Sequence, residues 1–190
     1  MQTLGITDFI IPPGVTWLGG GEGRGKTSLL RILAGELACP QSELRIADST
    51  LSAQPAAYRQ QVAWFDPHTA AFDQVMVQDF FNTTANRFPR WDGLLLARLT
   101  HALGLESHQH KPLYMLSTGT KRKVWLCAAL ASGAAITLLD EPFAALDKAS
   151  IGCVLDFLTE AASHPARAWV VADYQAPAGV PLAHRLDLGD

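Results

Sequence analysis

The sequence predicts an α/β fold in which a mainly parallel sheet is flanked by helices. A glycine-rich stretch at residues 20–27 joins an apolar run to a helix-like segment, and a second apolar run at 136–139 ends in two carboxylates. Strand-like and helix-like patterns alternate along most of the remaining chain. Such alternation is typical of parallel strands connected by helices that cover both faces of one sheet.

Length and charge limit the class of protein. The chain has 190 residues, enough for one core with a smaller inserted lobe, and a formal net charge of −3. No basic run favours nucleic acid, no apolar run reaches the roughly 20 residues that span a bilayer, and the N-terminus lacks a signal-peptide pattern. We therefore expect a cytoplasmic protein, with no nucleic-acid partner and with Cys39, Cys127 and Cys153 as reduced thiols.

Proline and glycine mark the first elements. A short strand is expected at residues 6–11, and the Pro-Pro-Gly turn that follows ends it before the strand at 15–18. Because so little chain precedes residue 20, the N-terminal β region is expected to be shortened. Gly35 and Pro40 end the first helix, and residues 43–46 and 61–65 are the next strand candidates.

The middle of the chain, residues 67–112, changes character and is interpreted as a mainly helical insertion. Within it, Trp91-Asp92 begins a helical pattern that Gly104 ends. The sequence thus predicts one domain, 1–190, with its core formed by 1–66 and 113–190. Further helices are expected at 121–130 and 150–160, and further strands at 136–139, 168–171 and 184–188.

The glycine-rich stretch fits the phosphate-binding pattern G-x-x-x-x-G-K-[ST] in its strand-loop-helix context, which predicts a P-loop NTPase core. Glycines let the backbone wrap closely around phosphates, and the helix start adds free N–H groups. Lys26 is expected to reach the β- and γ-phosphates, and the Thr27 hydroxyl to bind Mg²⁺. The expected nucleotide contacts in this region are Gly20, Gly21, Glu22, Gly23, Arg24, Gly25, Lys26, Thr27 and Ser28.

Asp140 and Glu141 follow an apolar strand, at the place where an open α/β sheet presents its functional groups. Asp140 can hold Mg²⁺ directly or through water, and Glu141 can polarise the water that attacks the γ-phosphate. In a chain without a phosphate loop, the same residues would be interpreted as a surface turn.

A second polar turn, Leu116-Ser117-Thr118-Gly119-Thr120, opens the helix at 121–130. Ser117 and the N–H groups near Gly119 are expected to form a second anion site at a helix start. By itself this turn also fits an ordinary N-capped helix.

These motifs, in this order, resemble those of the ATP-binding cassette (ABC) ATPases over nearly the whole chain. Residues 20–27 match Walker A, 116–120 the signature, 136–141 Walker B and 144–147 the D-loop, which adds Asp147 to the implied nucleotide contacts. The resemblance implies that two cassettes pair head to tail, with ATP between the Walker A of one and the signature of the other. It also implies that the helical insertion docks onto a membrane permease at the inner face of the cell membrane.

The apolar residues of the insertion have two interpretations. They contribute to the docking surface, or they form the insertion's own core. The residues concerned are Phe72, Val75, Met76, Phe80 and Phe81.

The chain departs from the family in three loops. His68 stands where the family has its Q-loop glutamine, and Asp173 or Tyr174 where it has the switch histidine. Tyr174 is kept as a candidate nucleotide contact. In the signature, Thr118 and Thr120 replace a glycine and a glutamine. These departures favour a slow or partner-dependent ATPase.

Three functions fit this resemblance. The first is the ATPase subunit of an ABC transporter, working as a homodimer or with a paralogous cassette. Its Lys-Arg-Lys after the signature and its Glu141-Pro142-Phe143 resemble small export cassettes, including the haem-exporter type of cytochrome c maturation. The second is a soluble non-transport ABC protein. The third is a regulatory nucleotide-binding module with impaired hydrolysis.

Overall fold

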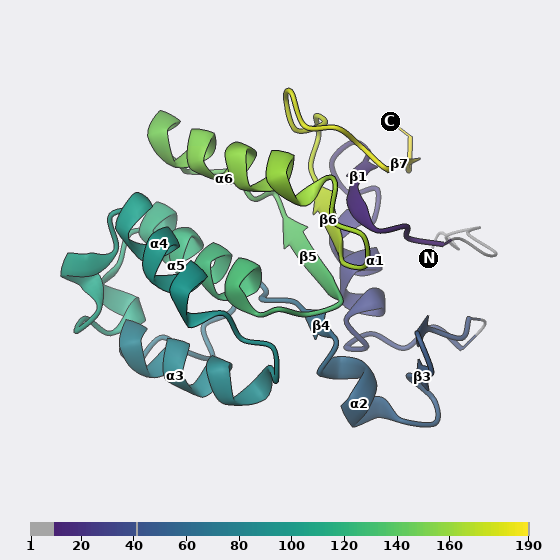
Figure 1. The fold of residues 1–190 in the computed structure, drawn as a ribbon, viewed down its shortest axis with the longest axis horizontal. Helices are drawn as coiled ribbons and strands as arrows, with labels where there is room; N and C mark the ends of the chain where they lie inside the picture. The colour runs from purple at the N-terminus through teal and green to yellow at the C-terminus, as the bar shows by residue number, and fades with distance from the viewer. Residues whose placement is uncertain (1–9, 41, 190) are drawn as a thin grey trace.

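The computed structural model describes residues 10–40 and 42–189. Its centre is a sheet of five parallel strands in the order β4-β5-β6-β1-β7 (Figure 1). The predicted parallel sheet is thereby confirmed. The strands are β1 (Gly14–Gly19), β4 (Val62–Ala63), β5 (Ile136–Asp140), β6 (Ala168–Ala172) and β7 (His184–Asp187).

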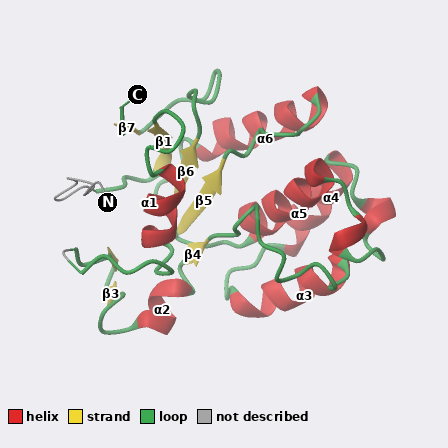
Figure 2. Ribbon diagram, turned by 180° about the vertical axis from the view of Figure 1, so that it is seen from behind, coloured by secondary structure: helices red, strands yellow, loops and turns green. Residues whose placement is uncertain are grey.

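Helices cover both faces of this sheet, as Figure 2 shows from behind. The helices are α1 (Lys26–Leu33), α2 (Pro55–Arg59), α3 (Val77–Arg87), α4 (Gly93–Ala102), α5 (Thr118–Ala131) and α6 (Lys148–Ala161), with 3-10 turns at Glu106–His108 and Leu113–Met115. Leu18 and Val170 pack with α1 on one face. Their neighbours Trp169 and Val171 point the other way, toward α6.

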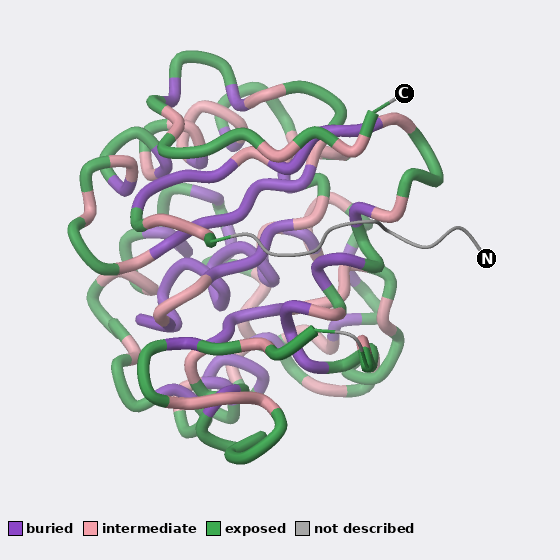
Figure 3. Tube along the Cα trace, turned by 90° about the vertical axis from the view of Figure 1, so that its right-hand side faces the viewer, coloured by how far each residue is buried: buried purple, intermediate pink, exposed green. Residues whose placement is uncertain are grey.

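The strand register places the functional loops at one edge. Leu18 of β1 and Asp140 of β5 both lie opposite Ala172 of β6, so the three parallel strands end at the same level. The phosphate-binding stretch follows β1 directly, and Glu141 follows β5. In the tube view the central strands are buried while the loops beyond them are exposed (Figure 3).

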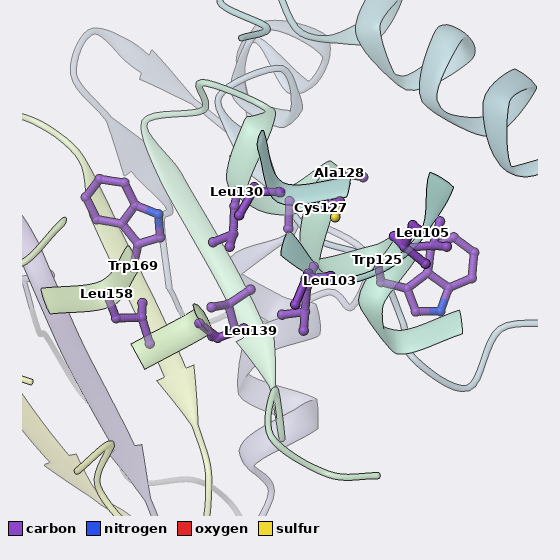
Figure 4. Packing of buried hydrophobic residues seen from close by; sticks show 14 of the residues in the cluster. Leu103, Leu105, Trp125, Cys127, Ala128, Leu130, Leu139, Leu158 and Trp169 are labelled. Atoms are coloured by element: carbon purple, nitrogen blue, oxygen red, sulfur yellow. The ribbon is translucent and has the colours of Figure 1, made fainter. Parts of the chain in front are cut away.

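Helices α3 and α4 form a lobe beside the sheet, and α5 runs along it (Figures 1 and 2). One hydrophobic cluster extends from Leu103 and Leu105 of the lobe through Trp125 and Leu130 of α5 to Leu139 of the sheet, as the labelled side chains of Figure 4 show. The lobe and the sheet thus share one continuous core. Helix α4 begins at the predicted place, because the Asp92 carboxylate accepts a hydrogen bond of 2.9 Å from the Leu95 N–H.

Several predicted elements differ in detail. The expected first strand lies mostly outside the described residues, and Ile10 and Ile11 belong to no strand. Residues near 43–49 form a small antiparallel hairpin of β2 (Arg45–Ile46) and β3 (Ser49–Thr50). Helix α2, which begins at a proline, was not predicted, since five residues are too few for a periodic pattern.

The strand predicted at 61–65 is confirmed only as β4, residues 62 and 63. It is an edge strand that pairs with β5 alone, and the two residues after it leave the ladder. The Trp64 indole N–H donates to Glu36 Oε2 at 3.1 Å, and Phe65 stacks on Trp125 with ring centroids 6.3 Å apart. Side-chain contacts with distant residues, rather than strand pairing, therefore hold Trp64 and Phe65.

Within the described part of the chain, no helix combines the length and the apolar character needed to cross a membrane. The three cysteines are free thiols, as expected, and burial raises the pKa of Cys127.

Candidate functional site

The phosphate-binding stretch forms a closed turn between β1 and α1. Gly25, with φ of 91°, is the residue before the helix, and this left-handed conformation favours glycine. The Lys26 ammonium donates to the carbonyl oxygens of Gly20 at 2.6 Å and Gly21 at 3.0 Å, so the loop curls around its own lysine. Lys26 is buried, while the side chains of Glu22 and Arg24 are exposed. The loop therefore encloses the Lys26 ammonium, while Arg24 faces solvent.

Thr27 and Asp140 come together across the sheet edge. The Thr27 hydroxyl donates to Asp140 Oδ2 at 2.7 Å, although 113 residues separate them. Burial raises the pKa of the Asp140 carboxyl, and the hydrogen bond from Thr27 opposes that shift. An alcohol and a carboxylate are hard oxygen donors of the kind that Mg²⁺ prefers, so this donor set fits the predicted metal.

Glu141 begins the turn after β5 in an unusual conformation. Its φ is 44°, which a residue with a side chain rarely adopts. Its N–H donates to the Ala172 carbonyl at 2.8 Å, so the end of β6 fixes the backbone while the side chain stays exposed. An exposed carboxylate next to the Mg²⁺ candidate Asp140 can orient a water molecule.

A residue that was not predicted as functional, Arg122, fixes the same turn. It is 7% exposed, and its guanidinium Nη1 donates to the carbonyl oxygens of Asp140, at 3.2 Å, and of Glu141. The sequence signal was the Lys-Arg-Lys run, but a run of charges does not show which member points inward.

The two flanking lysines of that run bind other segments. Lys121 donates to Asp73 of the insertion at 2.5 Å, and Lys123 donates to Asp147 at 2.7 Å. The start of α5 is therefore tied to three separate parts of the molecule by consecutive side chains.

The signature serine caps its own helix. Ser117 Oγ accepts from the Thr120 N–H at 3.2 Å and lies 2.9 Å from the Thr120 hydroxyl. Gly119 lies against the D-loop, since a Cβ at this position would overlap the carbonyl oxygen of Ala145. Among the described residues, no hydrogen bond joins this helix start to the phosphate loop, so the two predicted anion sites share none within one chain.

Asp147 caps helix α6. Its carboxylate accepts from the Ser150 N–H and hydroxyl, each at 2.9 Å, as well as from Lys123. The bond from Lys123, and then those from Ser150, hold the pKa of Asp147 well below its usual range. In this structure the D-loop aspartate holds α5 and α6 together.

Two of the altered loops follow β4 and β6, whose carboxyl ends lie at the same edge of the sheet as that of β5. The His68 N–H donates to Asp66 Oδ1 at 2.8 Å, and the side chain is exposed. Tyr174 is 66% exposed, whereas Asp173 is half-buried. No imidazole follows β6.

Comparison with known proteins places this geometry in a family. Residues 6–144 match the family described as ABC transporter. The chain belongs to this family. Its expected fold and ATPase class are thereby confirmed, and it binds ATP as an ABC ATPase domain.

The relatives of this ABC protein include exporters and importers. It is 31% identical over 176 residues to the cytochrome c biogenesis ATP-binding export protein CcmA of Pseudomonas syringae pv. syringae, covering 90% of this chain and 81% of CcmA. It is 30% identical to the molybdenum import ATP-binding protein ModC of Pseudomonas syringae pv. tomato, covering 80% of this chain and 44% of ModC. A solved ATP-binding subunit of an ABC transporter shares the fold, with a TM-score of 0.76, 21% identity, and coverage of 86% of this chain and 70% of that one.

Proposed function

We propose that this ABC subunit forms a head-to-tail dimer that closes on two molecules of Mg-ATP and drives export through a separate membrane permease. The partner of the dimer is a second copy or a paralogous cassette. The observation that carries the proposal is that the chain has two predicted anion sites, at Lys26 and at Ser117, with no hydrogen bond between the two segments among the described residues. A phosphate bound to Lys26 can be approached by the second site only if another chain supplies it.

Each residue at the sheet edge has a role in this proposal. Lys26 leaves the carbonyls of Gly20 and Gly21 to pair with the β- and γ-phosphates. Thr27 and Asp140 hold Mg²⁺, which neutralises phosphate charge. Glu141 orients the attacking water, and its held backbone keeps the carboxylate in place.

Hydrolysis by the isolated chain is proposed to be slow. Neither Asp173 nor Tyr174 offers an imidazole at the end of β6, where the family's switch histidine belongs, and His68 replaces the Q-loop glutamine. Asp140 and Glu141 are nevertheless retained. The chain therefore keeps a metal ligand and a base while it lacks two groups that sense the γ-phosphate, so turnover is proposed to depend on the permease.

A groove between the end of β4 and α3 supports docking of the permease. It has a volume of about 340 Å³, with Phe65, Val75, Phe80 and Trp125 in its lining. Phe80 is buried core, but Phe72 is 36% exposed at this groove. The apolar residues of the insertion thus divide between its core and a surface that an apolar partner segment can cover.

Export is supported by the CcmA relative, whose match covers 90% of this chain against 80% for ModC. Docking on a permease would hold the subunit at the inner face of the cell membrane.

Affinity purification from detergent-solubilised membranes of the source cells tests the partner. We expect an integral membrane protein to co-purify with the wild-type chain and not with Phe72→Glu, because a carboxylate in the groove is costly to bury. Leu94→Glu, at a position that is 82% exposed and outside this groove, is the matched control and should retain the partner. Wild-type chain that carries no membrane protein, while still binding ATP, would point instead to a soluble regulatory cassette.

A further inference from the structure

Asp173 lies at the carboxyl edge of the sheet, between the strand that leads into the phosphate loop and the strand that leads into Glu141. It is the first residue after β6, the strand that lies between β1 and β5. Its N–H donates to the Leu18 carbonyl at 3.2 Å, and the Trp17 indole donates to its carbonyl at 3.2 Å. On the other side, the preceding residue accepts the N–H of Glu141. The backbone of residues 172 and 173 is thus hydrogen-bonded to both neighbouring segments.

Asp173 and Glu141 follow paired residues of neighbouring strands, because Asp140 of β5 lies opposite Ala172 of β6. Burial raises the pKa of Asp173, the charge of Glu141 raises it further, and the charge of Lys26 and hydrogen bonds from backbone N–H groups oppose the shift. One of those bonds joins Asp173 Oδ1 to the Tyr174 N–H at 2.7 Å. Tyr174 is 66% exposed, whereas Asp173 is half-buried and directly follows Ala172, which lies opposite both Leu18 and Asp140.

We infer that Asp173 acts as a discriminating carboxylate that weakens binding of a triphosphate relative to a diphosphate. It places a second carboxylate beside Glu141, at the end of the site where the γ-phosphate of ATP must lie. A diphosphate ends before that position and avoids most of the repulsion. The inference rests on the proposed binding of ATP to the phosphate loop.

The expected size of the effect follows from Coulomb's law. Two unit charges about 4 Å apart in a partly exposed site repel each other strongly enough to change a dissociation constant about a thousandfold. Lys26 and Mg²⁺ reduce this repulsion because they lie among the same groups. We therefore expect the removal of the Asp173 charge to tighten ATP binding about tenfold while ADP binding changes less than twofold.

Equilibrium binding of Mg-ATP and Mg-ADP to the full chain tests this, by calorimetry at fixed ionic strength. Asp173→Asn removes the charge but keeps an oxygen that can accept the Tyr174 N–H, so the turn is preserved. Asp173→Glu keeps the charge. Asp156→Asn removes an equal charge from the exposed face of α6 and serves as the control for net charge.

The ratio of the ADP to the ATP dissociation constant should rise about tenfold in Asp173→Asn and stay within twofold of wild type in Asp173→Glu and Asp156→Asn. An unchanged ratio in Asp173→Asn, an equal rise in Asp156→Asn, or weaker ATP binding in Asp173→Asn would each overturn the inference. Two further results would refute ATP binding at this loop itself, and so the underlying proposal. One is a wild-type chain that binds neither nucleotide, and the other is a Lys26→Ala variant that binds both nucleotides as well as wild type does.

Discussion

At the scale of single residues, the proposed role of Glu141 depends on its backbone conformation as much as on its carboxylate. Glu141 has φ of 44°, a conformation that costs about 1–3 kcal/mol for a residue with a side chain. Its N–H is bound by the end of β6 and its carbonyl by the Arg122 guanidinium. Because Arg122 stands five residues after Ser117, the helix that starts at the signature also fixes the proposed base.

Replacing Arg122 by methionine removes this support while keeping an apolar stem in the buried position. We expect ATPase kcat to fall about tenfold with KM within about twofold, because a displaced base lowers the rate of the chemical step and leaves nucleotide binding intact. Steady-state kinetics with the partner present measures both constants. Arg98→Met, an exposed arginine of α4, is the matched control. A rise in KM with kcat unchanged would show that Arg122 serves binding instead.

At the scale of elements, the starts of α5 and α6 form one unit. Gly119 lies against the Ala145 carbonyl, and Lys123 donates to the Asp147 carboxylate that caps α6. Ala145 itself has φ of 60°, so the D-loop is held in a narrow geometry at the contact. Any change in the position of the signature therefore moves the D-loop.

A methyl group at Gly119 tests this contact. Gly119→Ala should lower the free energy of unfolding by about 1–3 kcal/mol, because the new Cβ overlaps a backbone oxygen that cannot rotate away. Gly152→Ala, in α6 with open space around its Cα, should instead raise stability by about 0.5–1 kcal/mol through better helix propensity. Urea unfolding measures both. Equal effects in the two variants would mean that the Gly119 contact imposes no constraint.

The local motifs were predictable from the sequence, and the contacts between them were not. The phosphate loop, the Asp92 cap and the strand before Asp140 depend on neighbours in the chain, which a pattern can show. The inward turn of Arg122 and the contacts that follow β4 depend on residues far away in sequence. The sequence leaves open whether Asp173 or Tyr174 takes the switch position, and Tyr174 is kept as the candidate nucleotide contact. Only the folded sheet shows that Tyr174 is 66% exposed while Asp173 is half-buried.

At the scale of the whole molecule, each chain is half of a working enzyme in the proposed head-to-tail dimer. The phosphate loop lies at the carboxyl edge of the sheet, while the signature begins α5 beside the lobe. The lobe and the sheet share one hydrophobic cluster, so they present both anion sites as parts of one body. Two such bodies related by a twofold axis bring each phosphate loop to the other's signature.

Size-exclusion chromatography with light scattering on Glu141→Gln measures this pairing most directly, with Mg-ATP, with Mg-ADP and without nucleotide. Removing the proposed base prevents hydrolysis, so ATP should remain between two chains. The predicted result is a species of twice the 20.5 kDa chain mass with Mg-ATP alone, and the single-chain mass in the other two conditions. A single-chain mass in all three conditions, with ATP binding shown separately, would contradict the proposal that the chain pairs with itself on ATP.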